Sequence, residues 1–487
     1  MVSLNIIVQN ISGLEIPKSN PAINSLVTDN RLAAKNDLFV ALKGTVTDSH
    51  QFIKDAINKG VSAVVCEYIP DDCPKDFTYQ IVKNTREILG QLASNFYGNP
   101  SSRLKLIGVT GTNGKTTVTT LLNNSFTSLQ YKTALISTVQ NIIDGEVIPS
   151  THTTPDPVLL NNLLNKMVEK GCEYCFMEVS SHAIDQNRIG GLTFAGGIFT
   201  NITHDHLDYH KTFESYLKTK KRFFDNLPSS AFALTNKDDR NGLVMLQNTK
   251  ASKYTYSLKT ISDFKGKIIE SDLNGLLLDI DNTQAWYGLA GNFNACNLLA
   301  VYGTAFILGI NKQEIIMALS KVRGAKGRFE IVRNANGVLG VIDYAHTPDA
   351  LKNVLETLNN VRSRNEILTT IVGCGGDRDK EKRPIMGDIA STLSDKVIFT
   401  SDNPRTENPE TIISEMKAGV KAQNFKKVLK ITNREEAINV AVSQANKGDI
   451  ILLAGKGHED YQEMKGVKIP FSDEKQALAA LSLWGRA

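Results

Sequence analysis

The residues with the clearest chemical meaning form a glycine-rich stretch, Gly111-Thr112-Asn113-Gly114-Lys115-Thr116-Thr117, between an apolar run and a helical pattern. Glycines there let backbone N–H groups face a phosphate, and the start of the helix adds positive potential. Lys115 could then reach the β- and γ-phosphates of a nucleotide, and Thr116 could bind Mg²⁺. The usual pattern of this loop has a glycine where the chain has Val109, and the chain has one at 111 instead. The stretch predicts a nucleotide-binding loop, with an incidental glycine-rich turn as the alternative.

Two clusters of acidic and histidine residues follow apolar runs further along the chain. Residues 203–210 (THDHLDYH) combine histidine with aspartate, which suits metal ligands or acid–base groups and equally a hydrated polar loop. Glu178 begins the second cluster, EVSSH, and Gln186 and Arg188 follow it closely. A carboxylate that leaves a parallel sheet at its carboxyl edge lies beside a phosphate loop, so Glu178 could support Mg²⁺. The two serines could also cap the next helix.

Three polar, glycine-containing or arginine-containing loops follow apolar runs in the last third of the chain: GCGGDRD (373–379), SDNPR (401–405) and GKGHED (455–460). Ligands bind at the carboxyl ends of strands in open α/β sheets. Arg378 and Arg405 could hold carboxylates through paired N–H groups, or could simply be salt-bridged at the surface. Together with the glycine-rich stretch, these loops indicate a nucleotide-dependent enzyme with a second anion site. The pattern leaves open whether a phosphoryl group passes to water, a hydroxyl or a carboxylate.

The elements that must position these residues fall into three parts, each with alternating strand and helix patterns. Turn-rich residues 98–103 and glycine-rich residues 324–330 separate the parts. We therefore expect an α/β protein with three domains. They are an N-terminal α/β domain (1–103), a central domain with a P-loop and a parallel sheet (104–328), and a C-terminal Rossmann-like domain (329–487).

Length and composition agree with this organisation. The 487 residues predict about three domains at ~150 residues each. Because 55 Lys+Arg against 51 Asp+Glu leave a net charge of only +4, we expect no nucleic-acid partner. No apolar run approaches the ~18–20 residues of a membrane span, and no secretory signal is visible, so a cytoplasmic protein is expected. Cys172 and Cys175 have CxxC spacing inside an apolar run, which predicts buried reduced thiols rather than a zinc site.

The motifs taken together resemble the ATP-dependent Mur ligases of peptidoglycan synthesis. The resemblance covers nearly the whole chain, and its motifs occur in the family's order. They are TDNR (28–31), GTVTDSH (44–50), GTNGKTT, THTTPD (151–156), EVSSHAIDQNR (178–188), TNITHDHLDYH (200–210), YLKTK (216–220), GNFNACN (291–297), GRFE (327–330), DYAHTPDAL (343–351), GCGGDRDKEKRP (373–384), DNPRTENP (402–409) and GKGHE (455–459).

The resemblance implies site residues position by position, with ATP and Mg²⁺ as cofactors and only small molecules as partners. Residues implied to bind ATP are Gly111, Thr112, Asn113, Gly114, Lys115, Thr116, Thr117, Asn294, Asn297, Arg328, Asp343 and His346. Those implied to bind the UDP-muramoyl-dipeptide are Asn30, Thr45, Val46, Thr153, Thr154, Ser180, Gln186 and Arg188. Those implied to bind the incoming amino acid are Arg378, Asp402, Asn403, Pro404, Arg405, Gly455 and Glu459. The implied catalytic residues are Lys115, Glu178, His206 and Lys220, and the implied metal-site residues are Thr116, Glu178, His206 and Lys220, the last as a carbamate.

The implied reaction is ATP-dependent ligation by a cytoplasmic monomer. It would add meso-diaminopimelate to the D-glutamate γ-carboxylate of UDP-N-acetylmuramoyl-L-alanyl-D-glutamate through an acyl phosphate. Arg405 in Asp402-Asn403-Pro404-Arg405 matches the diaminopimelate form of the motif, and an arginine fork suits the second carboxylate that L-lysine lacks. One departure is Asp29-Asn30-Arg31, where the family has serine in the middle.

Four alternatives follow from the same residues. The reaction could use L-lysine, or the chain could be a folylpolyglutamate-type ligase. From other classes, it could be a metal-dependent phosphohydrolase built on residues 203–210, or a nucleotide sensor without turnover.

Overall fold

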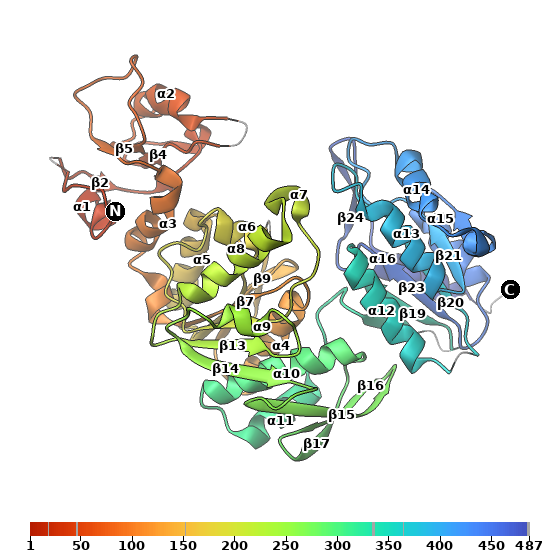
Figure 1. The fold of residues 1–487 in the computed structure, drawn as a ribbon. Coiled ribbons are helices and arrows are strands. Elements are labelled where there is room, and N and C mark those ends of the chain that lie inside the picture. Colours follow the sequence, from red (N-terminus) through yellow and green to blue (C-terminus); the bar gives the residue numbers. More distant parts are fainter. Residues whose placement is uncertain (18, 45–46, 151, 334–336, 364, 485–487) are drawn as a thin grey trace.

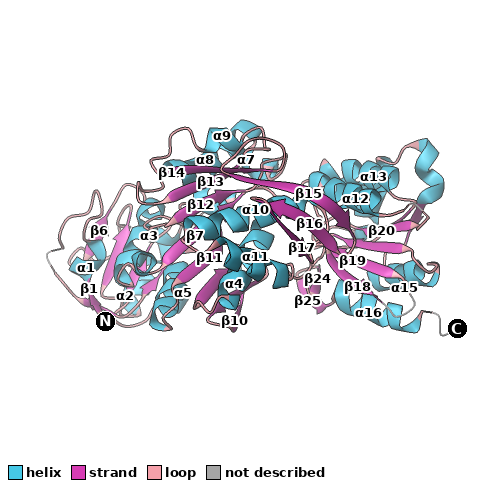
Figure 2. Ribbon diagram, turned by 90° about the horizontal axis from the view of Figure 1, so that it is seen from below, coloured by secondary structure: helices cyan, strands magenta, loops and turns pink. Residues whose placement is uncertain are grey.

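The computed structural model describes residues 1–17, 19–44, 47–150, 152–333, 337–363 and 365–484. Figures 1 and 2 show three α/β units in a row, with the two termini at opposite ends of the molecule. The order of the units follows the chain, as predicted. Among the described residues, no helix is both long and apolar enough to cross a membrane.

The N-terminal unit contains a four-stranded parallel sheet of order β3-β4-β5-β6 and a short antiparallel pair, β1-β2. Its strands are β1 Val2–Ser3, β2 Ala22–Ile23, β3 Leu26–Val27, β4 Leu38–Val40, β5 Ala63–Cys66 and β6 Tyr79–Ile81. Its helices are α1 Leu4–Val8, η1 Asn30–Leu32, η2 Ser49–Phe52, α2 Ile53–Asn58, α3 Thr85–Phe96 and η3 Pro100–Arg103. The predicted strand–helix–strand succession at 38–69 is present.

The central unit is built on an eleven-stranded sheet of order β10-β9-β8-β11-β7-β12-β13-β14-β15-β16-β17. Its strands are β7 Lys105–Thr110, β8 Thr133–Ile136, β9 Gln140–Ile143, β10 Glu146–Pro149, β11 Tyr174–Glu178, β12 Gly196–Phe199, β13 Phe232–Asn236, β14 Ser252–Ser257, β15 Phe264–Asp272, β16 Gly275–Ile280 and β17 Thr283–Tyr287. Its helices are α4 Lys115–Ser128, α5 Pro157–Glu169, α6 Ser181–Asp185, α7 Leu207–His210, α8 Phe213–Asp225, α9 Gly242–Met245, α10 Asn292–Ile307 and α11 Lys312–Lys321.

The predicted parallel sheet forms the middle of this larger, mixed sheet. Neighbouring strands pair in parallel along the stretch β8-β11-β7-β12-β13-β14-β15 of the sheet. At one edge β9 and β10, and at the other β16 and β17, are added by antiparallel pairing. Strand β15 was not predicted from the sequence, because exposed charged residues such as Lys265, Lys267 and Glu270 interrupt its apolar positions.

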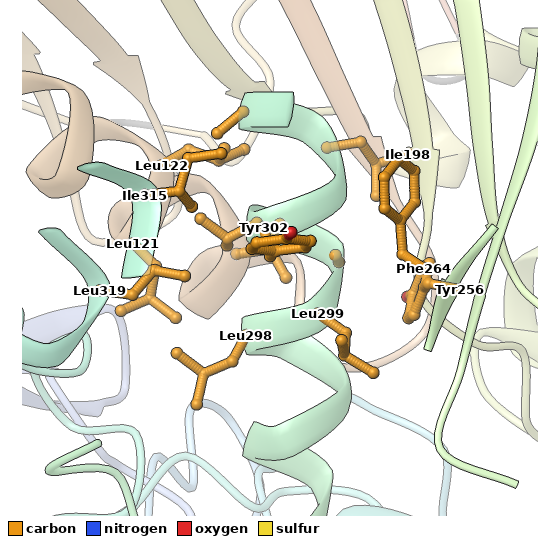
Figure 3. Close-up of a cluster of buried hydrophobic side chains, with 14 of the residues drawn as sticks. Leu121, Leu122, Ile198, Tyr256, Phe264, Leu298, Leu299, Tyr302, Ile315 and Leu319 are labelled. Carbon is orange, nitrogen blue, oxygen red and sulfur yellow. The ribbon is translucent and has the colours of Figure 1, made fainter. Parts of the chain in front are cut away.

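Buried side chains on helices and strands hold the central unit together. Helix α10 lies at the centre of one cluster, where Leu298, Leu299 and Tyr302 pack between α4, α11 and the sheet (Figure 3). Apolar residues around the whole circumference of α10 explain its burial. The CxxC pair lies in or next to β11, with both thiols buried and unpaired as predicted.

The C-terminal unit has a six-stranded sheet of order β18-β19-β23-β20-β21-β22, parallel except for β18. Its strands are β18 Glu330–Arg333, β19 Leu339–Asp343, β20 Leu368–Val372, β21 Lys396–Phe399, β22 Val428–Lys430 and β23 Ile450–Ala454, and β24 Tyr461–Met464 and β25 Val467–Pro470 form a separate hairpin. Its helices are α12 Pro348–Val361, α13 Lys382–Leu393, α14 Pro409–Ala418, η4 Ala422–Lys427, α15 Arg434–Ser443 and α16 Asp473–Leu483. We propose domain boundaries near residues 103 and 328, between these three units.

A buried ion pair joins α15 to α16 and supports the end of β23. Arg434 donates from Nε and Nη2 to the two carboxylate oxygens of Asp473, at 2.7 and 2.6 Å, and both side chains are fully buried. Nη2 also donates to the carbonyl of Ala454, at 3.0 Å.

We predict that Arg434→Met lowers the free energy of unfolding by about 3–5 kcal/mol, because Asp473 is left as an unpaired buried charge. Arg434→Met combined with Asp473→Leu should regain most of the loss. Urea unfolding, with hydrogen exchange of α15 and α16 as the probe, measures both effects. Equal losses in the single and double variants would contradict the explanation by an unpaired charge.

Candidate functional site

A cavity of about 1120 Å³ lies between the carboxyl edges of the central and C-terminal sheets. The strand order places β7 between β11 and β12, and ligands bind where neighbouring connections leave a sheet in opposite directions. The predicted residues that line the cavity are Gly111, Thr112, Asn113, Gly114, Lys115, Thr116, Thr117, Thr153, Thr154, Glu178, Ser180, Arg188, His206, Lys220, Asn297, Arg328, Asp343, His346, Arg378, Asp402, Asn403, Arg405, Gly455 and Glu459. The structure thus brings three separately predicted groups to one cavity.

Six predicted residues lie elsewhere or outside the described residues. Asn294 accepts a hydrogen bond from the lining residue Asn297, and Gln186 accepts one from the lining residue Arg188. Pro404 is buried within its loop. Asn30 lies in the N-terminal unit, where its side chain donates to Asp55 at 2.8 Å. Thr45 and Val46 lie outside the described residues.

The glycine-rich loop joins β7 to α4, as predicted. Gly111 (φ +155°) and Gly114 (φ +87°) have backbone angles that other residues rarely adopt. A Cβ atom at Gly111 would lie 1.9 Å from Thr200 Oγ1, so the strand end needs glycine there. Lys115 folds over the loop and donates to the carbonyls of Gly111 and Thr112, at 2.9 and 2.8 Å. The loop therefore offers backbone N–H groups, the start of a fourteen-residue helix and one amine to a phosphate.

Glu178 ends β11 beside this loop and is completely buried. Its carboxylate accepts from the backbone N–H and the hydroxyl of Thr138, at 2.7 and 3.1 Å. The partners fix its orientation and leave it lining the cavity. Next to it, Thr154 donates to the Glu178 carbonyl at 2.8 Å, and Arg188 donates to the Thr154 carbonyl at 2.9 Å. Thr154 and Arg188, two of the residues expected to hold the muramoyl-dipeptide, are thus linked to Glu178 by hydrogen bonds.

Lys220, on α8, is the second amine near the loop. It is 1% exposed, and its Nζ lies 2.8 Å from the Gly111 carbonyl and 4.8 Å from the centre of the Tyr216 ring. Burial, and after it the positive charge of Lys115, hold the pKa of Lys220 well below its ordinary value of 10.5. Both effects favour the neutral form of the amine, which is the form that can react with CO₂ to give a carbamate.

His206 faces the same region from a backbone with φ +53°. Burial lowers its pKa to about 4, although Asp205 opposes the shift. At neutral pH its imidazole is uncharged and can bind a metal ion. The described residues contain no group of three or more His, Cys, Asp or Glu side chains placed to hold a metal. The carboxylate of Glu178, the hydroxyl of Thr116 and the imidazole of His206 could hold Mg²⁺ together with phosphate oxygens and water.

Three further residues implied to bind ATP lie on α10 and on the linker between the central and C-terminal sheets. Asn297 donates to Asn294 at 3.0 Å, and Arg328 reaches from the linker to the Thr116 hydroxyl at 3.2 Å. The Arg328 guanidinium lies 4.5 Å from the centre of the Tyr344 ring. Its buried Nε has no hydrogen-bond partner among the described residues, so a donor remains for a ligand.

Asp343 ends β19 and accepts from the backbone N–H of Phe329, at 2.7 Å. Burial raises its pKa from 3.8 to about 6, even though the charge of Arg328 opposes the shift. The folded state therefore favours the protonated carboxyl, and its ionisation destabilises the fold as the pH rises from about 4 through 6.

We predict that Asp343→Asn is more stable than the wild type at pH 7.5 by up to about 3 kcal/mol. The difference should shrink as the pH falls towards 4, where both forms carry a neutral group. Urea unfolding at a series of pH values measures it, with the exposed Asp460→Asn as the matched control. A difference that does not change with pH would contradict the assigned cause.

The residues expected to bind the incoming amino acid follow three neighbouring strands of the C-terminal sheet. Arg378 follows β20, residues 402–405 follow β21, and Gly455 and Glu459 follow β23. Asn403 donates to Glu459 at 2.8 Å, and Arg405 donates through Nη1 to the Gly376 carbonyl at 2.6 Å. Arginines and carboxylates therefore lie at one end of the cavity, as a zwitterionic ligand requires.

Asp349 and Lys456 are two of the lining or supporting residues that the sequence analysis missed. Asp349, at the start of α12, accepts from Asn113 and Thr203 of the central unit, at 3.0 and 3.1 Å, although an acidic residue there reads as an ordinary helix start. Lys456 lies inside a motif that was recognised, GKGHE, but nothing in its type indicated that it is fully buried.

Comparisons with known proteins agree with this arrangement. The "Mur ligase family, catalytic domain" matches residues 22–97, the "Mur ligase middle domain" residues 109–305 and the "Mur ligase, glutamate ligase domain" residues 327–457. The UDP-N-acetylmuramoyl-L-alanyl-D-glutamate–2,6-diaminopimelate ligase of Cytophaga hutchinsonii is 57% identical over 452 residues, 93% of each chain. That of Phocaeicola vulgatus is 55% identical over 460 residues, 94% of this chain and 95% of the relative.

A solved structure of a ligase with the same name is 32% identical and has a TM-score of 0.70. The match covers 99% of this chain and 99% of that one. The shared motifs thus come with a shared sequence along almost the whole length and with a shared three-unit fold. On that basis the chain belongs to the Mur ligase family.

Proposed function

We propose that the protein is the ATP-dependent ligase that joins meso-diaminopimelate to the D-glutamate γ-carboxylate of UDP-N-acetylmuramoyl-L-alanyl-D-glutamate, in peptidoglycan precursor synthesis. The observation that carries the proposal is the single cavity, in which the phosphate loop and Glu178 face the arginines and carboxylates of the C-terminal sheet. Relatives above 50% identity bear the name of this ligase. We further propose that it acts as a cytoplasmic monomer.

The proposed reaction activates a carboxylate and then forms an amide. The γ-phosphoryl group of ATP passes to the glutamate carboxylate, the amine of diaminopimelate attacks the acyl phosphate, and phosphate leaves. Lys115 and the loop N–H groups offset the charge of two anions that approach each other. Mg²⁺, held by Thr116, Glu178 and His206 together with the phosphates, would supply further positive charge when bound.

Closure of the cavity protects the acyl phosphate from water. Asp349 and Arg328 already link the two sheets through Asn113, Thr203 and Thr116. Because these contacts lie at the phosphate loop, the C-terminal unit can close when the nucleotide is in place.

The test is release of ADP and phosphate by the purified protein with each substrate omitted in turn. We expect turnover only when ATP, the UDP-muramoyl-dipeptide and meso-diaminopimelate are all present, with L-lysine a poor substitute at matched concentration. Turnover without the dipeptide or the amino acid would identify a phosphohydrolase. ATP binding without turnover under any combination would identify a nucleotide sensor.

A further inference from the structure

A buried lysine stands directly behind the amino-acid end of the cavity. Lys456 follows Gly455 at the end of β23, and its side chain is 0% exposed. Its Nζ lies 3.0 Å from Glu459 Oε2, 3.1 Å from Asn403 Oδ1 and 3.4 Å from Asp402 Oδ1. The three acceptors engage all three N–H donors of the ammonium group.

The two carboxylates contacted by Lys456 both line the cavity. Asp402 and Glu459 carry two negative charges and Lys456 one positive charge, so this group has a net charge of −1. Two neighbouring buried carboxylates without a cation would retain a proton, because like charges cannot both ionise at low cost. One further cation would make the group neutral.

The surroundings of Glu459 also disfavour its ionised form when no cation is near. Burial and the charge of Asp402 raise the pKa of Glu459, and Lys456 opposes the shift. The Tyr344 hydroxyl donates to its other oxygen at 3.3 Å, and the Tyr461 ring lies 5.7 Å from Lys456 Nζ. Arg434, the other buried cation nearby, is committed to its bidentate pair with Asp473. Lys456 is thus the cation in direct contact with both carboxylates among the described residues.

We propose that Lys456 is a positioning residue that keeps Asp402 and Glu459 both ionised, so that both carboxylates can accept from one ammonium group of the ligand. The inference rests on the proposed function and deepens it. Arg405 and Arg378, on the neighbouring loops, supply positive charge for a carboxylate. A site for one ammonium group beside a site for one carboxylate matches the α-amino acid end of a diamino diacid. Lys456 acts through Asp402, Asn403 and Glu459, and does not itself meet the substrate.

The experiment compares KM for meso-diaminopimelate between pH 6.5 and 8.5 in the wild type, Lys456→Met and Lys468→Met. Lys468 is the matched control, because it is exposed and lies over the same Tyr461 ring, 4.2 Å from its centre. At pH 7 we expect Lys456→Met to raise this KM about 10- to 100-fold. KM for ATP should stay within about twofold.

The pH profile separates charge from packing. Without Lys456 the carboxylate pair retains a proton at neutral pH, so KM of Lys456→Met should fall as the pH rises and the proton leaves. Lys456→Arg keeps the charge and should keep the wild-type profile even where its KM is raised. Asp402→Asn combined with Lys456→Met leaves Glu459 without a neighbouring carboxylate that would make it retain a proton, and should also lose the pH dependence.

Each outcome bears on one claim. A KM of Lys456→Met that is unchanged, or raised equally at every pH, would overturn the proposed role of Lys456. If Lys456→Met does not fold, Lys456→Gln is measured in its place with the same expectation. A wild type that forms no product from the three substrates contradicts the proposed function instead, and the two failures are distinct.

Discussion

Arg405→Ala is expected to lower kcat/KM for meso-diaminopimelate by about 10²- to 10³-fold while KM for ATP stays within about twofold. The loss corresponds to about 3–4 kcal/mol, within the range expected for removing one partner of a paired charge. Steady-state kinetics with each substrate varied in turn measure it. The expectation depends on Arg405 lying at the cavity with free donors, since only Nη1 and Nε have partners within the described residues, the Gly376 carbonyl and Glu463.

The loop that carries Arg405 is held from both sides. Its backbone has φ +50°, and its N–H donates to the Glu463 carbonyl at 3.0 Å. Behind it, the fully buried Arg383 donates to both oxygens of Glu407, at 2.9 and 2.8 Å. Because alanine and lysine at 405 bear the same backbone cost as arginine, variants there report on the side chain.

Arg405→Lys is the matched control for that prediction. It keeps the charge and loses the paired N–H geometry, so an intermediate loss of about tenfold is expected. The preference for meso-diaminopimelate over L-lysine should fall in Arg405→Ala, because only the former has the second carboxylate. Equal damage to the use of ATP, or an unchanged preference, would show that Arg405 does not hold that carboxylate.

Removal of CO₂ is expected to lower the activity of the wild type, and Lys220→Ala is expected to lower kcat by about 100-fold or more. We expect the unprotonated amine of Lys220 to add to the carbon of CO₂ and to release a proton, so that a side chain that would otherwise be a cation becomes an anion. Beside Lys115 and the phosphate loop, an anion can support bound Mg²⁺, whereas an ammonium would repel it. The estimate follows from the loss of one electrostatic contact in a buried site.

The measurement pairs activity with spectroscopy. The wild type, depleted of CO₂ and then given ¹³C-bicarbonate, should regain activity together with a carbamate carbon signal. Lys220→Ala should show neither, and Lys218→Ala, exposed on the same helix, should behave as the wild type. Full activity at the lowest attainable CO₂ would leave Lys220 as an unmodified amine and refute the carbamate.

Strand ends are the part of the site that local sequence predicts well. Each of the loops at 111–117, 178–188, 373–379, 401–405 and 455–460 follows an apolar run that forms a parallel strand. The carboxyl ends of parallel strands lie at one edge of a sheet. That the polar residues after these strands lie close together can therefore be predicted without the tertiary structure. Strand β15 was not predicted, because exposed charged residues interrupt its apolar positions.

The sequence by itself determined the order of elements, the family and the residues that can contact phosphate, carboxylate and metal, because these depend on residue type and short spacing. Tertiary structure alone decided which charges are buried and what they face. Lys456 and Lys468 are the same residue type in the same stretch of chain, yet one is enclosed by Asp402 and Glu459 and the other is exposed. Desolvation and the distance between charges set the strength of an electrostatic interaction, and both come from packing between residues far apart in sequence.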